Sequence, residues 1–385
     1  MRMTRRAVLR GIGLSAAGVE GSMSLRSAFA AGEATVRVGM VLPVTGPGAD
    51  AGRFALGGAK LALDAVNKAG GVLGKPLELV TEDDQTTNPG AVLAFSKLAS
   101  QPDIVAFLGS IRSTQNHAMA PDILKTAKPV CFGGTDPTLT HLGNPWLFRF
   151  RPNDTYSARV IADYGVATLG KKKWAVVHST DAFGTSGAKA LTEALGKAGA
   201  TVALDQGYSN QSQDFTPVVL AIRQAGVEVI GSYFTFENDL GIFARQLRQL
   251  GVTVPWVGSP SITNVTALKL AGPALYGTFG VADYAEDASD TSRAFGKLYR
   301  DAYKLEPDNQ SSWTFDAVTV LAKAINAAGK TDPQAIREAL LAVKDVPGAE
   351  GTYTFDSNGD GLHGYNVVRN DKGKMSFDKR VDFKD

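Results

Sequence analysis

Short apolar runs alternate with longer amphipathic stretches along most of the chain. Val36–Leu42 and Ile104–Leu108 consist mostly of Val, Leu, Ile, Ala, Met and Phe, which predicts buried strands. Between these runs, apolar residues recur at intervals of three and four, the spacing of one helix face: Leu56, Ala59, Leu63 and Val66. Strands that alternate with helices predict right-handed βαβ units, and therefore a mostly parallel sheet with helices on both faces.

The same alternation starts again at Trp174, so the chain contains two such units. Further strands are predicted near 174–178, 201–204, 227–234 and 255–258. The stretch 144–155 separates the units and is predicted to cross between them in an extended conformation, and 277–281 is predicted to cross back. We therefore expect an α/β fold of two Rossmann-like lobes, with parallel sheets flanked by helices, joined by a multi-strand hinge that allows closure over a ligand.

The predicted domain boundaries follow from these crossings. They are 1–30 for a signal peptide, 31–150 for an N-terminal lobe, 151–280 for a C-terminal lobe, 281–346 for a return to the N-terminal lobe, and 347–385 for a C-terminal hairpin region that lies mostly with the C-terminal lobe. The stretch 356–361 matches the start of a calcium loop, but the twelfth position is Val367 and not the Glu that would bind the ion through both oxygens. We therefore expect a hairpin turn between strands at 352–355 and 365–368, and no metal site.

Residues 1–30 have the features of an export signal. The first ten residues carry Arg but no acidic residue, a mildly apolar stretch follows, and Ala28-Phe29-Ala30 has the small-x-small form of a cleavage site. The adjacent Arg5 and Arg6 and the weak hydrophobicity favour the twin-arginine route, which predicts a periplasmic location. A disordered basic N-terminus is the alternative, and Glu20 within the stretch is not explained.

Composition narrows the function further. The 40 Lys and Arg nearly balance the 38 Asp and Glu, for a formal net charge of +2, so no basic patch for nucleic acid is predicted. The one cysteine, Cys131, excludes an internal disulfide and is predicted to be a buried small hydrophobe. We expect a monomer.

Three loops carry the candidate binding chemistry. They follow predicted strands of the first lobe at 43–52, 109–115 and 133–137, and each combines hydroxyl side chains and glycines at the start of a helix. Because the carboxyl ends of parallel strands meet at one sheet edge, the three loops should lie close together. In any one loop, the hydroxyl and carboxylate side chains are explained by helix capping. Together, the hydroxyls and backbone N–H groups of the three loops form an anion-binding geometry and predict a carboxylate ligand.

In their order and spacing, these loops and several further motifs resemble the type I periplasmic solute-binding proteins of ABC transporters, in the branched-chain amino acid (Leu/Ile/Val) group. The resemblance covers 35–370 and rests on the segments 43–47, 67–74, 82–84, 109–121, 133–137 and 181–184. It implies a transport protein that is not an enzyme. It also implies a small carboxylate as ligand and a membrane permease as partner.

The resemblance also implies roles for individual residues. By position, Ser113 and Thr135 would bind the ligand carboxylate, and the Gly133 carbonyl would accept from an ammonium group. From the second lobe, Phe183 and Phe236 would close over the ligand.

The chain departs from the family at several of these positions. Both aromatics lack the hydroxyl of the common tyrosine, and Ser259 lies in a loop where an acidic residue often pairs the ammonium. An aromatic or other acid without an amino group therefore fits about as well as a branched-chain or other hydrophobic amino acid. Arg112 could pair with an anionic ligand in bidentate fashion, and a surface arginine or a contact between lobes is the alternative.

An exported enzyme on a similar scaffold is the rival hypothesis. A hydrolase needs a positioned nucleophile and base, yet the chain has no Gly-x-Ser-x-Gly motif. It also lacks a Gly-x-x-x-x-Gly-Lys-Ser/Thr phosphate loop and zinc-ligand spacing. We therefore expect no catalytic residue, no cofactor and no metal. The binding-protein hypothesis is favoured.

Overall fold

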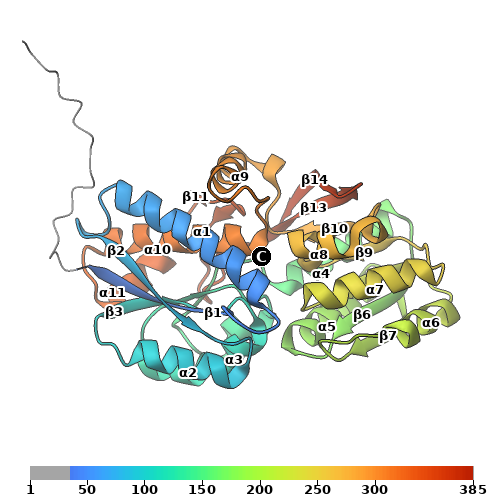
Figure 1. Cartoon of the computed structure of the whole chain (residues 1–385), viewed down its shortest axis with the longest axis horizontal. Coiled ribbons are helices and arrows are strands. Elements are labelled where there is room, and N and C mark those ends of the chain that lie inside the picture. Colours follow the sequence, from blue (N-terminus) through green and yellow to red (C-terminus); the bar gives the residue numbers. More distant parts are fainter. Residues whose placement is uncertain (1–34, 385) are drawn as a thin grey trace, which may run out of the picture.

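The computed structural model describes residues 35–384, so the predicted export signal, with Arg5 and Arg6, lies outside the described residues. Two sheets lie side by side, each with helices on both faces, and the chain passes between them at the centre of the molecule (Figure 1). Among residues 35–384, no helix is long and apolar enough to cross a membrane.

The first lobe is built on a five-stranded parallel sheet of order β2-β1-β3-β4-β5. Its strands are β1 (Val36–Leu42), β2 (Leu77–Asp83), β3 (Ile104–Leu108), β4 (Val130–Phe132) and β5 (Leu147–Arg149). The helices of this lobe are α1 (Ala49–Lys68), α2 (Asn88–Ala99), α3 (Ser113–Thr126), α10 (Asn309–Ala328) and α11 (Pro333–Leu341), and α9 (Asp290–Tyr303) packs on α1. Strand residues alternate between the two faces: Met40 meets the core under α1 and α10, whereas Val41 meets the core under α2 and α3.

The second lobe is built on a seven-stranded sheet of order β14-β13-β10-β9-β8-β6-β7, parallel from β10 to β7. Its strands are β6 (Lys173–Ser179), β7 (Thr201–Tyr208), β8 (Val229–Tyr233), β9 (Trp256–Gly258), β10 (Phe279–Ala282), β13 (Gly364–Asp371) and β14 (Lys374–Asp382). Helices α4 (Asp154–Asp163) and α5 (Ala182–Lys197) cover one face, and α6 (Thr216–Ala225), α7 (Glu237–Gln249) and α8 (Val265–Ala271) cover the other. The predicted architecture of two lobes with parallel sheets is confirmed.

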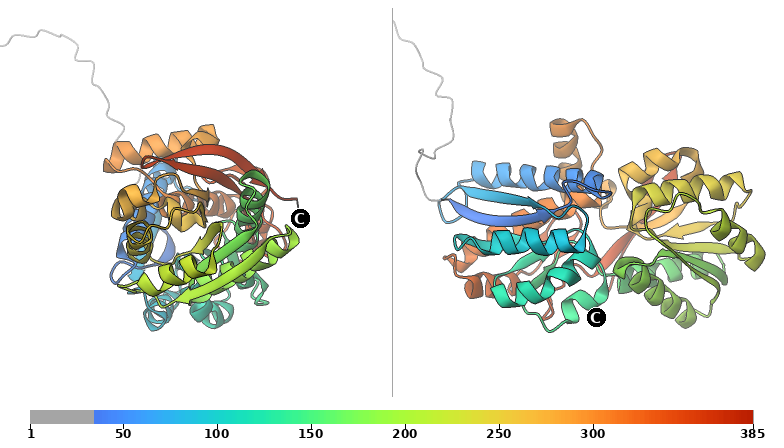
Figure 2. Two further views of the ribbon diagram at one scale, coloured as in Figure 1. Left: turned by 90° about the vertical axis from the view of Figure 1, so that its right-hand side faces the viewer. Right: turned by 60° about the horizontal axis from the view of Figure 1, so that its bottom comes forward.

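Three segments cross between the lobes, and the right-hand view of Figure 2 shows the region where the lobes meet. They are 150–153 after β5, 283–289 after β10, and 354–363 before β13. Two buried ion pairs tie them together: Arg149 Nε lies 2.7 Å from Asp360 Oδ1, and Arg151 Nη2 lies 2.6 Å from Asp283 Oδ2. The hinge is therefore held by charges that are shielded from water, where losing one partner is costly.

Two details of the sequence analysis are wrong. The stretch 277–281 does not itself cross, because Phe279–Ala282 pairs with β9 and β13 as a strand of the second sheet. The hairpin between 352–355 and 365–368 does not form either: β12 (Thr352–Tyr353) pairs with β11 (Val346–Pro347), and β13 pairs with β14.

The stretch 356–361 contains a turn that is held by a side chain. Asp356 Oδ1 accepts from the backbone N–H groups of Asn358 and Asp360, so this carboxylate organises the turn. Among residues 35–384, no cluster of His, Cys, Asp or Glu could hold a metal ion. Cys131 is fully buried in the core under α1, as predicted.

Candidate ligand-binding cleft

The starts of four helices, α3, α5, α7 and α10, contribute to one cleft between the lobes. The cleft, together with the open solvent at its mouth, has about 480 Å³ of space unoccupied by atoms. Its lining consists of Ile111, Arg112, Ser113, Thr114, Thr135, Arg151, Asp181, Phe183, Phe234, Thr235, Glu237, Ser261, Asn264, Asn309 and Gln310. The first N–H groups of each helix have no partner within that helix, so the cleft is rich in backbone donors and favours an anionic group.

The start of α3 forms the first-lobe side of the cleft. Ser113 is buried, and its Oγ accepts from the Asp136 N–H at 3.1 Å, so the hydroxyl hydrogen remains free to donate. Next to it, the N–H groups of Ser113 and Thr114 belong to the first turn of the helix. This side of the cleft therefore suits a carboxylate, as the resemblance implies.

Thr135 is placed differently from its predicted role as a carboxylate donor. It lines the cleft, but its Oγ1 donates to Asp154 Oδ2 at 2.8 Å, and its carbonyl accepts from the Asp154 N–H. Burial raises the pKa of Asp154 to about 7. The hydrogen bond from Thr135 acts in the opposite direction and lowers this pKa, because it stabilises the ionised carboxylate. With its hydrogen directed to Asp154, Thr135 presents an oxygen that accepts.

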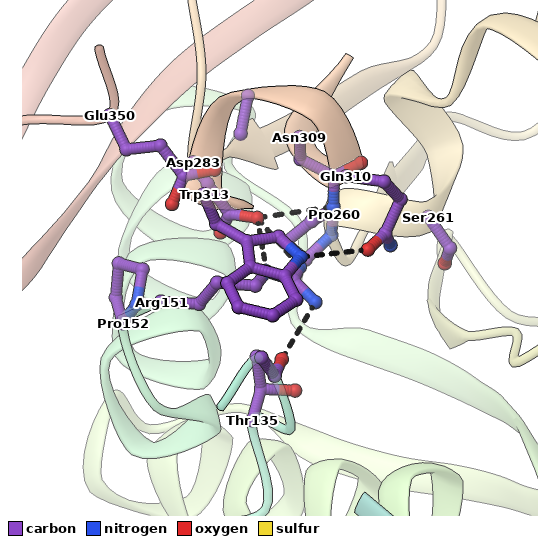
Figure 3. A network of polar contacts seen from close by, with 12 residues as sticks. Thr135, Arg151, Pro152, Pro260, Ser261, Asp283, Asn309, Gln310, Trp313 and Glu350 are labelled. Carbon is purple, nitrogen blue, oxygen red and sulfur yellow. Dashed lines mark hydrogen bonds and ion pairs between the residues drawn. The ribbon is translucent and has the colours of Figure 1, made fainter. Parts of the chain in front are cut away.

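The Gly133 carbonyl does not face an open position for an ammonium group. Arg151 Nη1 donates to it at 3.2 Å, and the figure of the network shows this guanidinium beside the Trp313 ring (Figure 3). A Cβ on Gly133 would lie 2.7 Å from the Trp313 indole, so only glycine fits there. Arg151 thus donates a hydrogen bond to the same carbonyl oxygen that, by the resemblance, would accept from the ligand ammonium group.

Arg112 joins the two lobes. Its Nη1 donates to the Thr235 carbonyl at 2.7 Å, and its guanidinium lies 4.3 Å from the centre of the Phe236 ring. Its Nε and Nη2 are buried without a partner in the described part of the chain, so the same side chain can also donate to a ligand in the cleft. A second contact between lobes, from Thr266 Oγ1 to Asp50 Oδ2 at 2.9 Å, shows that the lobes are closed.

The aromatic side chains of the second lobe divide between the cleft and its border. Phe183 and Phe234 line the cleft, whereas Phe236 does not and packs beneath Arg112. The residue after Phe183 must be glycine, because a Cβ on Gly184 would lie 2.2 Å from the Ser179 carbonyl oxygen. A larger residue would therefore displace the loop that carries Phe183. Ser259 is also outside the lining, with its Oγ bonded to the Oγ of Ser261 at 2.8 Å.

An acidic residue does reach the cleft, from a position outside the loop where the family often has one. Glu237 lies in the first turn of α7, and its Oε1 accepts from Asn264 Nδ2 at 3.0 Å. Its second oxygen has no donor among residues 35–384, and the Asn264 Oδ1 is buried without a partner. Asp181, which also lines the cleft, already accepts three hydrogen bonds from its own lobe, and Asp239 is buried outside the lining. Glu237 and Asn264 therefore form the acceptor group for a cation.

The cleft brings together four of the seven residues singled out from the sequence: Arg112, Ser113, Thr135 and Phe183. Gly133, Phe236 and Ser259 lie immediately behind the lining and support it. The sequence analysis missed Arg151, Asn309 and Gln310. One signal could have indicated the last two, because the Asp308-x-x-Ser311 capping box marks the start of the helix that follows α9.

Comparison with known proteins agrees with this architecture. A family model described as periplasmic binding protein matches residues 35–374. The chain belongs to the periplasmic binding protein family. The resemblance noted in the sequence is thereby confirmed, and the protein is a solute-binding protein and not an enzyme.

Curated relatives of this binding protein carry names from amino acid transport. It is 29% identical over 334 residues to the leucine-, isoleucine-, valine-, threonine- and alanine-binding protein of Pseudomonas aeruginosa, which covers 85% of this chain and 87% of the relative. It is also 29% identical over 350 residues to Leu/Ile/Val-binding protein homolog 3 of Brucella melitensis, covering 89% of this chain and 93% of the relative.

Solved structures share the fold. A leucine-binding protein from Thermotoga maritima superposes with a TM-score of 0.85 at 23% identity, covering 90% of this chain and 99% of the other. A solute-binding protein of an ABC transporter from R. palustris, in complex with benzoate, superposes with a TM-score of 0.82 at 20% identity, covering 89% and 95%.

Proposed function

We propose that this periplasmic binding protein is the extracytoplasmic substrate-binding component of an ABC importer. It acts as a monomer that captures a small α-amino acid between its lobes and delivers it to a membrane permease. The names of its relatives support transport of amino acids. The twin-arginine pattern at Arg5 and Arg6 supports delivery to the periplasm.

One observation carries the choice of ligand: donors and acceptors face each other across the cleft. The start of α3, with Ser113 and Thr114, offers N–H and O–H donors for a carboxylate. The acceptors Glu237 and Asn264 come from the second lobe and suit an ammonium group. A zwitterionic α-amino acid satisfies both sets, because its two charged groups are attached to one carbon.

A second candidate is an acid without an amino group. It is favoured by the Gly133 carbonyl, which lies outside the lining of the cleft and already accepts a hydrogen bond from Arg151. The benzoate complex of a protein with this fold is consistent with such a ligand. Against it, Glu237 would then be a carboxylate in the cleft without a cationic partner, beside the ligand carboxylate.

Calorimetry on protein stripped of bound ligand by unfolding and refolding distinguishes the two. Leucine, its deaminated 2-oxo acid and benzoate would be titrated into the wild type and into Glu237→Gln, which keeps the shape of the side chain. A hydrogen bond to a charged group is worth about 1.5–3 kcal/mol, so the oxo acid should bind roughly ten- to a hundredfold more weakly than leucine. The Glu237→Gln variant should lose affinity for leucine and not for the two acids.

Tighter binding of the oxo acid or benzoate than of leucine, unaffected by Glu237→Gln, would favour the second candidate. Ligand recovered unchanged after incubation is expected in all cases, because the protein binds and does not catalyse.

A further inference from the structure

The part of the cleft nearest the hinge is polar, although the resemblance implies a hydrophobic ligand. Of the 15 lining residues, only Ile111, Phe183 and Phe234 are apolar. Arg151 comes from the first crossing segment, Asn309 and Gln310 come from the start of α10, and Figure 3 shows the three gathered around Trp313. All three are buried, so each polar atom needs a partner.

Arg151 is only partly satisfied by the protein. Its Nε and Nη2 donate to Asp283 Oδ2 at 2.9 and 2.6 Å, and its Nη1 donates to the Gly133 carbonyl. A guanidinium has five N–H bonds, so two of them have no acceptor among residues 35–384. Because the charge of Arg151 is already balanced by Asp283, this end of the cleft has hydrogen-bond donors but little net positive charge.

Gln310 has a fixed amide orientation that presents donors. Its Oε1 accepts from Trp313 Nε1 at 3.1 Å, and an indole N–H can only donate, so the oxygen must face the ring. The Nε2 group then points elsewhere, and it has no acceptor among residues 35–384.

Asn309 presents the opposite kind of atom. Its Nδ2 donates to Asp283 Oδ2 at 3.1 Å, which fixes the amide in the same way. Its Oδ1 is therefore an acceptor, and it is buried without a donor from any residue between 35 and 384. Donors on Arg151 and Gln310 thus lie with an acceptor on Asn309 at one end of the cleft.

We propose that this hinge-end subsite, formed by Arg151, Asn309 and Gln310, recognises a carboxamide on the side chain of the ligand, so that the protein prefers amide amino acids to branched-chain ones. A carboxamide supplies an oxygen for the free donors and an NH₂ group for Asn309. A carboxylate has no donor for Asn309 and meets no net positive charge, and a hydrocarbon satisfies none of the three.

The proposal rests on the proposed function, since it assumes that the α-amino and α-carboxylate groups bind as described above. A site that hydrogen-bonds a group of its ligand rejects analogues without that group, because the buried polar atoms of the site are then left unpaired. Isosteric ligands test this directly: asparagine, leucine and aspartate have side chains of similar shape, as do glutamine, methionine and glutamate.

Calorimetry of the six amino acids on the ligand-stripped protein should show one amide amino acid binding at least about tenfold more tightly than its hydrocarbon and carboxylate analogues. The variant Gln310→Met removes the donors, and Gln310→Glu retains an oxygen for the Trp313 indole while removing the NH₂ group. Both variants should lose most of the preference for the amide over the hydrocarbon. Melting temperatures would show that each variant is folded.

The outcomes separate this inference from the proposed function. If leucine binds as tightly as asparagine, and methionine as tightly as glutamine, the hinge-end subsite is not selective for amides and the inference is overturned, while capture of α-amino acids stands. If the amide preference is present but unchanged in both Gln310 variants, the assignment of the subsite is overturned. If none of the six binds, the proposed function itself fails.

Discussion

Arg112 should hold the lobes closed, and removing its head group should weaken ligand binding through faster release. The substitution Arg112→Met keeps most of the stem and removes the guanidinium. It deletes the 2.7 Å bond to the Thr235 carbonyl and the contact with the Phe236 ring at 4.3 Å, both of which join one lobe to the other. Neither contact can form when the lobes separate.

The expected magnitude follows from these two contacts. A hydrogen bond from a charged group is worth about 1.5–3 kcal/mol, and an exposed cation–π contact adds about 0.5–1 kcal/mol. Arg112 is only partly buried, so we take about 2 kcal/mol for both together. When the ligand-free protein is mostly open, this loss raises Kd about 30-fold. Since ligand enters the open cleft, the change should fall on the dissociation rate.

Stopped-flow kinetics and calorimetry with the best-binding amino acid would measure the effect. Arg223→Met, on the exposed surface of α6, is the matched control and should change nothing. Phe236→Leu separates the closing contact from a direct bond between Arg112 and the ligand, because Phe236 does not line the cleft. Its effect should be smaller, about two- to fivefold. Unchanged Kd and dissociation rate in Arg112→Met would refute the reasoning.

Three further predictions concern the hinge, pH and export. Arg149→Met should lower the free energy of unfolding by about 3–5 kcal/mol, measured by denaturant unfolding, because it leaves Asp360 buried without its cation. Thermal stability should fall as the pH rises from about 4 to about 7, because burial raises the pKa of Asp154 from 3.8 to about 7. In this window the folded state binds more protons than the unfolded chain, so raising the pH favours unfolding. The variant Asp154→Asn should show a smaller decline. Changing Arg5 and Arg6 to Lys should leave the precursor in the cytoplasm, as measured by fractionation and immunoblotting.

Each of these has a contradicting result. An Arg149→Met protein as stable as the wild type would mean that the hinge ion pair contributes nothing, and Arg37→Met, at a more exposed pair, is its control. A pH profile of stability that is identical in Asp154→Asn would exclude that carboxyl group as a cause. Mature protein outside the cytoplasm in a strain without the twin-arginine machinery would exclude that route.

Most of the fold could be predicted from local patterns, because the strands of both sheets are short apolar runs and the helices have apolar faces. The C-terminal part was harder. Thr352–Tyr353 pairs with a strand of only two residues, Val346–Pro347, which carries no periodic signal. The turn at Asp356 indicated a hairpin, but the carboxylate of Asp360 faces Arg149 at the end of β5, and such a long-range pair has no local signature.

The candidate site was predictable where it depends on helix starts and not where it depends on contacts across the hinge. Ser113 and Thr135 follow strands, and their positions in the cleft could be expected. Arg151 and Gln310 are far apart in the sequence and line one cleft only because the first crossing segment lies beside the start of α10. Glu237 lies at a helix start, but the direction of its side chain depends on its hydrogen bond to Asn264.

A crystal structure of the stripped protein soaked with the amino acid that binds most tightly would test the central claim most directly. The account predicts an ammonium nitrogen within about 3 Å of Glu237, with the carboxylate at the N–H groups of Ser113 and Thr114. An ammonium nitrogen bonded to the Gly133 carbonyl, with Arg151 displaced and Glu237 without contact to the ligand, would contradict it.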